Sequence, residues 1–416
     1  MSKFNKHFKL TEQDVIEYVK EKLDFFSQDA QLDCKEIGDG NINFVFRVFD
    51  EKSGKSVIIK HSDIQVRSSK RDIGLDHNRI EAEILQLQQK LAPDLVPKVY
   101  LYDPIMCCIC MEDLKDYENM RYAMIAHKVF PGFSEHITTF MANTLIKTTD
   151  NVITPQKKKE MVKNFINPEL CEITERLVYT EPYLNTLGLN KEFEPNKEFL
   201  KKELYEDKEL HLEVAKLKEA FKSNTQALIH GDLHTGSIMI KPGSTKVLDP
   251  EFACYAPSGY DIGNLIANLI FAWVNAEVTM REGKQKDAFI SWVEESIIQI
   301  VDLFKKKAIK ILKEECTDAM AKTAGFIEWY VENLLADSAG VAGCELNRRV
   351  VGTAKVKDIT GIEDENKRIL AERICVLTAK ECIKNRSKAY HNGADYITTI
   401  RLAVKKAKNF DKEREK

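Results

Sequence analysis

The stretch Leu228-Ile-His-Gly-Asp-Leu-His-Thr-Gly-Ser237, followed closely by Val247-Leu-Asp-Pro-Glu251, is the most informative part of this chain for its architecture and chemistry. Apolar residues flank both segments, which is typical of buried strands rather than of a solvated acidic loop. Together the segments carry three carboxylates, Asp232, Asp249 and Glu251. If they meet, one carboxylate can orient a hydroxyl nucleophile while two hold a divalent cation. Because alternate side chains of an extended segment face one way, we expect Asp249 and Glu251 to reach one cation.

The bulk composition is that of an ordinary soluble globular protein with two or three lobes. Of 416 residues, 44% are hydrophobic and 31% charged, and the formal net charge is -3. This balance gives no electrostatic case for a nucleic-acid partner. The amino terminus lacks an apolar signal core, and the longest apolar run, residues 262–274, is too short to span a bilayer. We therefore expect a buried helix at this run, no membrane partner, and a cytoplasmic protein.

The cysteines and tryptophans are expected in the core. The 10 cysteines show no framework spacing, which fits a reducing compartment. Cys107 and Cys110 form a C-x-x-C pair without a second pair at metal-binding spacing, and they lie in an apolar run, so a core position is favoured over a metal or redox site. Trp273, Trp292 and Trp329 lie in helical segments and are interpreted as core residues rather than ligand platforms.

Strand signals gather towards the amino terminus and helical periodicity dominates after residue 133. The strand signals lie at residues 44–49, 56–60, 99–111 as two strands, 227–230, 237–241 and 246–248. This pattern predicts an α+β, bilobal fold. A small β-rich N-terminal lobe, residues 1–112, would be followed by a larger helical C-terminal lobe, residues 113–416.

The glycine-containing stretch Gly38-Asp-Gly-Asn-Ile-Asn43 lies between two predicted strands. It is a candidate phosphate cradle, because glycines let backbone N–H groups approach phosphate oxygens and Asn43 adds a side-chain donor. A hairpin turn explains the glycines as well. Lys60 ends the following strand, where an ammonium can pair with ATP phosphates. Glu81 opens the next helix and can pair with Lys60, although an exposed helix charge is an equally good interpretation.

The order of these parts resembles that of protein-kinase-like phosphotransferases. Met111-Glu-Asp-Leu114 follows the last strand of the small lobe, where a chain crossing between lobes can present backbone groups to an adenine edge. The parts then occur in the same order as in kinases: the glycine loop, the lysine, the helix glutamate, the crossing segment, the H-G-D motif and the D-x-E motif. H-G-D-x-H in place of H-R-D resembles the small-molecule branch, which includes aminoglycoside and choline kinases.

Longer motifs resemble the 5-methylthioribose kinase family. They are His230-Gly-Asp-Leu-His-Thr-Gly-Ser237, Asp249-Pro-Glu-Phe252, Tyr255-Ala-Pro-Ser-Gly-Tyr-Asp-Ile-Gly263, Cys344-Glu-Leu-Asn-Arg-Arg349, Gly38-Asp-Gly-Asn-Ile-Asn-Phe-Val-Phe46 and Asn167-Pro-Glu-Leu-Cys-Glu-Ile-Thr-Glu-Arg176. The likeness runs from about residue 30 to 385. It implies a homodimeric enzyme that uses ATP and Mg²⁺ to phosphorylate the C1 hydroxyl of the small sugar 5-methylthioribose, in methionine salvage.

The resemblance also implies a role for each matching residue. Asp232 would contact the substrate as the catalytic carboxylate, accepting the proton of the C1 hydroxyl as it attacks the γ-phosphate. Asp249 and Glu251 would hold Mg²⁺. The ATP contacts would come from Asn43, Lys60, Glu112, Asp113, Leu114, Asp249, Pro250 and Glu251.

Arg348 and Arg349 would lie at the substrate end. We favour Arg348 for the direct contact, because adjacent residues on a helix diverge by about 100 degrees. Without the resemblance, a charge cluster at a helix C-terminus explains this pair.

Three further polar residues of the motif region are given supporting roles. Ser237 stands where protein kinases place a metal-binding asparagine, and because serine is a poorer magnesium ligand, Glu251 is expected to take over that duty. His234 is interpreted as a brace of the catalytic loop. Asp261 precedes an apolar helix, which favours helix capping or loop bracing over catalysis.

Other functions remain open from the sequence. A choline or aminoglycoside kinase of the same fold would favour an aromatic cage or an acidic cluster for its cationic substrate, and paired arginines suit neither. A non-catalytic ATP-binding module would be expected to lack Asp232, Asp249 or Lys60, and all three are present. An interaction scaffold of packed helices leaves the three carboxylates unexplained.

Overall fold

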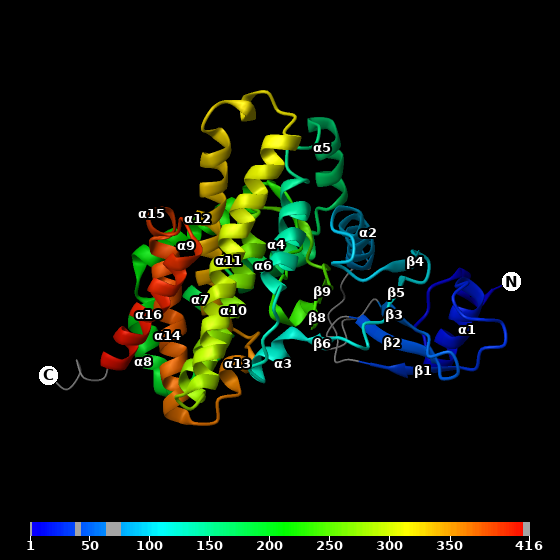
Figure 1. The fold of residues 1–416 in the computed structure, drawn as a ribbon, viewed down its shortest axis with the longest axis horizontal. Helices are drawn as coiled ribbons and strands as arrows, with labels where there is room; N and C mark the ends of the chain where they lie inside the picture. Colours follow the sequence, from blue (N-terminus) through cyan, green and yellow to red (C-terminus); the bar gives the residue numbers. More distant parts are fainter. Residues whose placement is uncertain (1, 38–42, 64–75, 411–416) are drawn as a thin grey trace.

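The amino-terminal part of the computed structural model is built on a five-stranded antiparallel sheet (Figure 1). The structure describes residues 2–37, 43–63 and 76–410, so most of the predicted phosphate cradle, residues 38–42, lies outside the described residues. The strands are β1 (Leu32–Glu36), β2 (Asn43–Asp50), β3 (Ser56–Ser62), β4 (Val99–Asp103) and β5 (Cys108–Glu112), in the order β1-β2-β3-β5-β4. Each pairs with its neighbours in antiparallel register.

Side-chain alternation gives this sheet two buried faces. Val57 and Ile59 of β3 pack with α1 (Glu12–Lys22), while Ile58, which lies between them, joins the core that contains Leu85 of α2 (Asp76–Leu91). Both faces of the sheet are therefore covered by other parts of the protein. Cys108 and Cys110 are fully buried in this core, so the expectation of core cysteines is confirmed.

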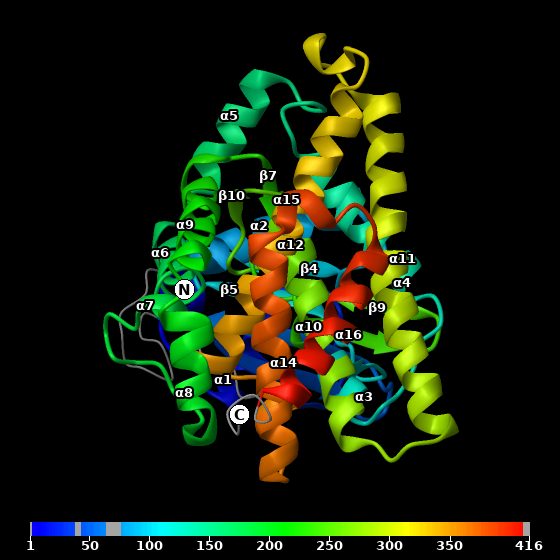
Figure 2. The same cartoon turned by 90° about the vertical axis from the view of Figure 1, so that its left-hand side faces the viewer.

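The remainder of the chain is mostly helical. Its main helices are α4 (Phe133–Met141), α5 (Pro155–Asn164), α6 (Pro168–Leu177), α9 (Lys208–Ser223), α10 (Gly259–Thr279), α11 (Lys284–Glu315), α12 (Phe326–Val351), α14 (Glu365–Lys384) and α16 (Gly393–Asn409). Shorter helices are α3 (Met120–Ile125), α7 (Glu181–Leu184), α8 (Lys197–Leu200), α13 (Lys357–Thr360) and α15 (Arg386–Ala389). The α11–α12 hairpin projects at the top of Figures 1 and 2.

Helix α10 is the centre of this helical part. It crosses α12 closely, because a Cβ on Gly259 or Gly263 would lie 2.7 or 2.5 Å from the backbone of Ser338. By length and composition α10 could cross a membrane, yet 89% of its most apolar window is buried inside the protein. The apolar run at residues 262–274 is therefore the buried core helix that the sequence predicts.

Two small sheets lie at the junction of the strand-rich and helical parts. Strand β7 (Ala227–Ile229) pairs with β10 (Cys254–Ala256), and β8 (Ile238–Lys241) lies between β6 (Glu118–Asn119) and β9 (Ser244–Val247). The predicted α+β, bilobal, kinase-like fold is confirmed, with an antiparallel-sheet N-terminal lobe and a mostly helical remainder. Strands β1, β6 and β10 were not predicted; β1 is largely polar, with one buried residue among five, and β6 and β10 have only two and three residues.

The prediction that all three tryptophans are core residues is wrong for Trp329. Trp273 is buried at 4% exposure and donates its indole N–H to Glu294, whereas Trp329 is 59% exposed. Trp329 lies near the start of α12, where the α11–α12 hairpin projects from the body. Helical periodicity cannot reveal that a helix end extends beyond its neighbours.

Candidate active site

Lys60 joins the two lobes by a buried ion-pair network. Its Nζ lies 2.6 Å from Glu81 Oε1 on α2 and 2.9 Å from Asp249 Oδ1 in the carboxylate segment. Burial alone would lower the pKa of Lys60, but the charges of Asp249, Glu81 and Glu251 outweigh it and raise that pKa above its usual value. The ammonium therefore stays charged. The sequence left the Glu81–Lys60 pair open, and the structure confirms it.

The carboxylate segment brings Asp249 and Glu251 together, but not as an extended strand. Asp249 has a left-handed φ of 62°, and Glu251 follows in a turn. The expectation that alternation along a strand aligns them was wrong; they converge because each is held by a partner in the N-terminal lobe. Asp249 contacts Lys60, and Glu251 Oε2 accepts a hydrogen bond from Asn43 Nδ2 at 3.1 Å. Pro250, between them, is buried.

Glu251 has surroundings that favour its neutral form. Burial raises its pKa to about 8, with the carboxylates of Glu81 and Asp249 adding to the effect against the opposing charge of Lys60. Glu81 is also shifted, since burial raises its pKa to about 6 despite Lys60. Three carboxylates therefore share one ammonium in this part of the site.

The chemistry of this donor set fits a magnesium ion that is shared with phosphate oxygens. Among residues 2–37, 43–63 and 76–410, no group of three or more His, Cys, Asp or Glu side chains is placed to hold a metal by itself. Magnesium in nucleotide sites is bound by one or two carboxylates, with phosphates and water completing the octahedron. Asp249 and Glu251 can supply those two carboxylates.

The catalytic loop that follows β7 is fixed by Asp261 at the start of α10. Asp261 accepts hydrogen bonds from the backbone N–H of His230 at 2.7 Å and of Gly231 at 3.0 Å. Gly231 has φ +81°, and a Cβ there would lie 2.2 Å from the carbonyl oxygen of Phe252, so the loop packs directly on the carboxylate segment. Burial raises the pKa of Asp261 to about 7. The expected bracing role is thereby confirmed.

Asp232 projects from this loop into a setting rich in nitrogen donors. Its Oδ2 lies 3.3 Å from His234 Nε2, and its Oδ1 lies 3.8 Å from Arg349 Nη2. Burial would raise the pKa of Asp232, but His234, Arg349 and Arg348 outweigh it and hold that pKa well below its usual range. Asp232 is therefore an ionised carboxylate throughout the physiological pH range.

His234 and Ser237 complete the loop by bonding within it. His234 Nδ1 accepts from the backbone N–H of Ser237 at 3.0 Å, and Ser237 Oγ donates to the carbonyl oxygen of Asp232 at 2.9 Å. The interpretation of His234 as a brace is confirmed. The hydroxyl of Ser237 is engaged by the loop itself, in keeping with a metal duty that falls to Glu251.

The paired arginines lie near the end of α12 and share a buried acid. Glu345 contacts Arg349 Nε at 2.6 Å and Arg348 Nη1 at 3.3 Å, each one turn along the helix. The direct ion pair with Asp232 is made by Arg349, while Arg348 contributes to the field around that carboxylate. Both arginines thus lie on the Asp232 side of the site.

A cleft of about 650 Å³ lies between the five-stranded sheet and the small strands β6 and β8. Its lining includes Val45, Ile58, Lys60, Met111, Glu112, Asp113, Leu114, Met239, Leu248 and Asp249. The side chains of Glu112 and Asp113 are already engaged. Glu112 contacts Lys246, and Asp113 accepts hydrogen bonds from Nε and Nη2 of Arg47. The crossing segment therefore offers this cleft backbone groups and the apolar side chain of Leu114.

Two supporting residues were not assigned from the sequence. Asn167 Nδ2 donates to the carbonyl oxygens of Glu251 and Ala253, which fixes the carboxylate segment from α6. Arg121 on α3 contacts Asn268 and Thr235, which braces the end of the catalytic loop from the opposite side. These contacts span more than 80 residues, so no local pattern could reveal them. For Asn167, its position in a motif shared with the resembled family was the available signal.

Comparison with known proteins agrees with this geometry. The model of the "Phosphotransferase enzyme family" matches residues 167–289, which hold both carboxylate-bearing segments. The match covers the segments that carry Asp232, Asp249 and Glu251, and it is to a phosphotransferase family. The solved structure of a choline kinase from Cryptosporidium parvum aligns over 97% of this chain and 97% of its own, with 10% sequence identity and a TM-score of 0.46.

Curated relatives identify a narrower family. A methylthioribose kinase of Bacillus pumilus is 36% identical over 386 residues, covering 92% of this chain and 94% of that protein. Those of a Geobacillus species and of Bacillus cereus are each 38% identical, covering 91% and 92% of this chain and 92% and 94% of theirs. The chain belongs to the methylthioribose kinase family.

Proposed function

We propose that the protein transfers the γ-phosphate of ATP to the C1 hydroxyl of 5-methylthioribose, a step of methionine salvage. The observation that carries the proposal is the presence of two charged groups near His230. One is the ionised Asp232, flanked by Arg348 and Arg349, and the other is the cluster of Lys60, Asp249 and Glu251. Membership of the methylthioribose kinase family supports the choice of acceptor.

In this reaction the site would divide the work between its two sides. Asp232 accepts a hydrogen bond from the acceptor hydroxyl, orients its lone pair towards the γ-phosphorus and takes the proton as the new P–O bond forms. Arg349, already held by Glu345, is placed to meet the negative charge of the moving phosphoryl group. Arg348 is our choice for the contact with the sugar hydroxyls.

The nucleotide side rests on residues from both lobes. Lys60 would pair with ATP phosphates and Asn43 would donate to one of them, while the backbone of residues 112–114 would meet the adenine edge. Asp249 and Glu251 would hold Mg²⁺, which supplies charge neutralisation of the phosphates when bound. The apolar lining from Val45, Ile58 and Met239 suits a planar base.

The wider setting is part of the same proposal. The lobes would divide at residues 112 and 113, where β5 ends, and the nucleotide would bind between them. We further propose a homodimer in the cytoplasm, as the family resemblance implies, with no nucleic-acid or membrane partner. Size-exclusion chromatography with light scattering tests the dimer independently of activity.

A turnover assay with three acceptors tests the function. Purified protein with ATP and Mg²⁺ is expected to release ADP with 5-methylthioribose, and not with choline or kanamycin. Release with choline or kanamycin alone would assign the protein to the other branch of the fold. If none of the three supports release while ATP still raises the melting temperature, the site binds nucleotide without catalysing this transfer.

A further inference from the structure

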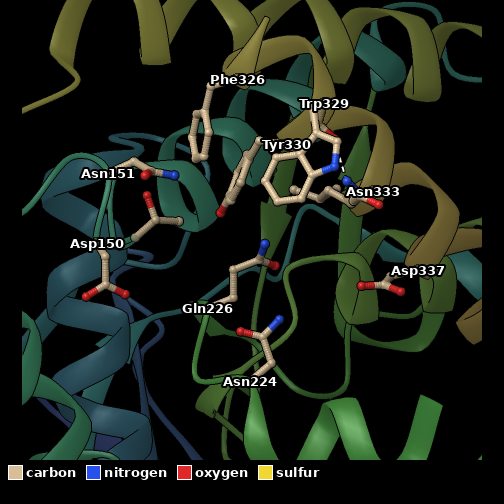
Figure 3. Close-up of a pocket in the computed structure, with 11 residues that line it drawn as sticks. Asp150, Asn151, Asn224, Gln226, Phe326, Trp329, Tyr330, Asn333 and Asp337 are labelled. Atoms are coloured by element: carbon tan, nitrogen blue, oxygen red, sulfur yellow. Dashed lines mark hydrogen bonds between the residues drawn. The ribbon is translucent and has the colours of Figure 1, made fainter. Parts of the chain in front are cut away.

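A second cavity, of about 380 Å³, opens beside the first turns of α12, and no described residue lines both it and the cleft (Figure 3). It is lined by Thr149, Asp150, Asn151, Asn224, Gln226, Phe326, Trp329, Tyr330, Asn333, Leu334 and Asp337. The catalytic roles proposed above use none of these residues. Trp329, whose exposure contradicts the sequence-based expectation, belongs to this cavity.

One wall of the cavity is aromatic. Trp329 remains 59% exposed, and its ring centroid lies 5.5 Å from that of Phe326. Phe326 in turn stacks on Tyr330, with centroids 6.0 Å apart and ring planes within 22°. Rings this large bury 150–250 Å² when covered, so an open aromatic wall gains most from a ring-shaped molecule laid against it.

The facing walls are polar and amide-rich. Asn151, Asn224 and Gln226 bring side-chain amides to the cavity, each able to donate and accept hydrogen bonds (Figure 3). The hydroxyl oxygen of Tyr330 is buried and makes no well-aligned hydrogen bond within the described part of the chain, although the side chains of Thr149, Gln226 and Ser258 lie close to it. Buried hydroxyls without partners are uncommon, and a ligand donor or acceptor would satisfy this one.

In the part of the chain that the structure describes, the cavity has no positive charge to attract an anion, and its acidic residues are already neutralised, so it does not attract a cation either. Among the described residues that line it, none is Lys, Arg or His. Its two acids are already paired from outside the lining, Asp150 with Lys158 at 2.7 Å and Asp337 with Arg386 at 2.6 Å. Phosphorylated compounds would meet uncompensated acceptors, whereas an uncharged ligand meets a nearly neutral surface.

We infer that this cavity is a second small-molecule site, for an uncharged ring that carries several hydrogen-bonding groups. A free sugar and a nucleoside both supply that chemistry. Gln226 directly precedes β7 and accepts a hydrogen bond from the backbone N–H of Ser258, which directly precedes α10. A ligand bound to Gln226 therefore touches the segments that lead into the catalytic loop and out of the carboxylate segment.

Calorimetric titration of the protein saturated with both ADP and 5-methylthioribose tests this inference, because these two ligands keep the probes out of the nucleotide cleft and the proposed acceptor side. The probes are adenosine, ribose and AMP. At least one of adenosine and ribose is expected to bind in a one-to-one ratio, and AMP at least tenfold more weakly than adenosine. Binding of adenosine alone identifies the base as the recognised ring, and binding of ribose assigns recognition to the sugar.

Three variants locate the binding. Trp329→Ala should weaken it at least tenfold, and Tyr330→Phe, which removes only the hydroxyl, should weaken it several-fold. Met320→Ala, 76% exposed on the same hairpin and outside the lining, is the matched control and should bind as the unaltered protein does. The inference is overturned if neither adenosine nor ribose binds, if Trp329→Ala leaves the affinity for the bound probe unchanged, or if adenosine binds and AMP binds as tightly. None of these readouts depends on turnover.

Discussion

Asp232 and Glu251 are carboxylates of one site in opposite electrostatic surroundings. Asp232 lies near His234, Arg348 and Arg349, and these neighbours hold its pKa far below the usual range. For Glu251, burial raises the pKa to about 8, and Lys60 is the main opposing charge among acidic neighbours. The carboxyl group is thus kept ionised at Asp232, whereas the surroundings of Glu251 favour its protonated form.

The difference shows what each side lacks. The Asp232 side offers the guanidinium groups of Arg348 and Arg349 beside an ionised carboxylate, so it suits an anionic phosphoryl group and a hydroxyl that must lose its proton. On the other side three carboxylates face one ammonium, so it suits a divalent cation that completes their neutralisation. Under the proposed function, the Asp232 side would therefore be the acceptor side and the Lys60 side the metal side, and their charges already differ before any ligand binds.

Removing the negative charge of the acceptor side should have the largest effect. Asp232→Asn is expected to lower kcat about 10³-fold, because the amide cannot take the proton of the attacking hydroxyl. Binding of ATP, followed by thermal shift, should change little. Asp116→Asn, an exposed aspartate outside the site, serves as the control. Survival of more than a tenth of the turnover would remove Asp232 from the catalytic role.

Breaking the metal side at Lys60 should cost stability as well as activity. Lys60→Met leaves Glu81, which is fully buried, without its ammonium and should lower the free energy of unfolding by about 3–5 kcal/mol. Adding Glu81→Leu should restore much of this loss without restoring turnover. Urea unfolding of both variants, with the exposed Lys90→Met as control, measures the effect. Equal stability of Lys60→Met and the unaltered protein would contradict a structural role for the pair.

The raised pKa of Glu251 makes metal binding dependent on pH. Mg²⁺ needs the ionised carboxylate, so below pH 8 its affinity should fall by up to about tenfold per pH unit, with uptake of metal releasing a proton. Calorimetry of Mg²⁺ binding to the ADP complex at pH 6.5 and 8.5, in buffers of different ionisation enthalpy, measures both. Glu251→Gln should bind Mg²⁺ weakly and with a flat pH profile. An unaltered affinity between the two pH values in the unmodified protein would refute the shift.

The smallest effect is expected at the shared brace, Asp261. Asp261→Asn keeps only one acceptor for the N–H groups of His230 and Gly231, so at pH 5.5 it should destabilise the protein by about 1 kcal/mol. The pKa of Asp261 in the folded protein, about 7, lies above its value in the unfolded chain, so the folded state binds the carboxyl proton more tightly. The unaltered protein therefore loses stability as pH rises from 4 through 7. The variant has no such proton to lose, so the difference in stability between the two proteins should narrow at pH 8. A gap that is the same at both pH values, measured by thermal unfolding, would contradict the shifted pKa.

How much the sequence predicts depends on whether a residue's role is local. The fold class, the strands that carry the motifs and the buried α10 follow from periodicity over short windows. The Lys60–Glu81 pair is different, because its two residues are 21 positions apart and only the kinase-like order of parts suggested it. Asp249 and Glu251 do lie together as predicted, but strand alternation is not the cause, because the positive φ of Asp249 turns the chain there.

Residues that act through distant contacts stayed hidden. Asn167 fixes the carboxylate segment across 84 positions, and Arg121 reaches Asn268 across 147. Trp329 was misjudged because burial depends on what packs around a helix, and the sequence of α12 alone is silent about that. The roles that could not be predicted from the sequence therefore depend on tertiary contacts rather than on residue type.

The most direct test of the account is the position of the transferred phosphate. After turnover with 5-methylthioribose, ATP and Mg²⁺, the phosphorus NMR spectrum should show a new resonance coupled to the anomeric proton, in an amount equal to the ADP formed. Coupling to the protons at C2 or C3, or formation of inorganic phosphate in place of a sugar phosphate, would contradict the assignment of Asp232 to the C1 hydroxyl.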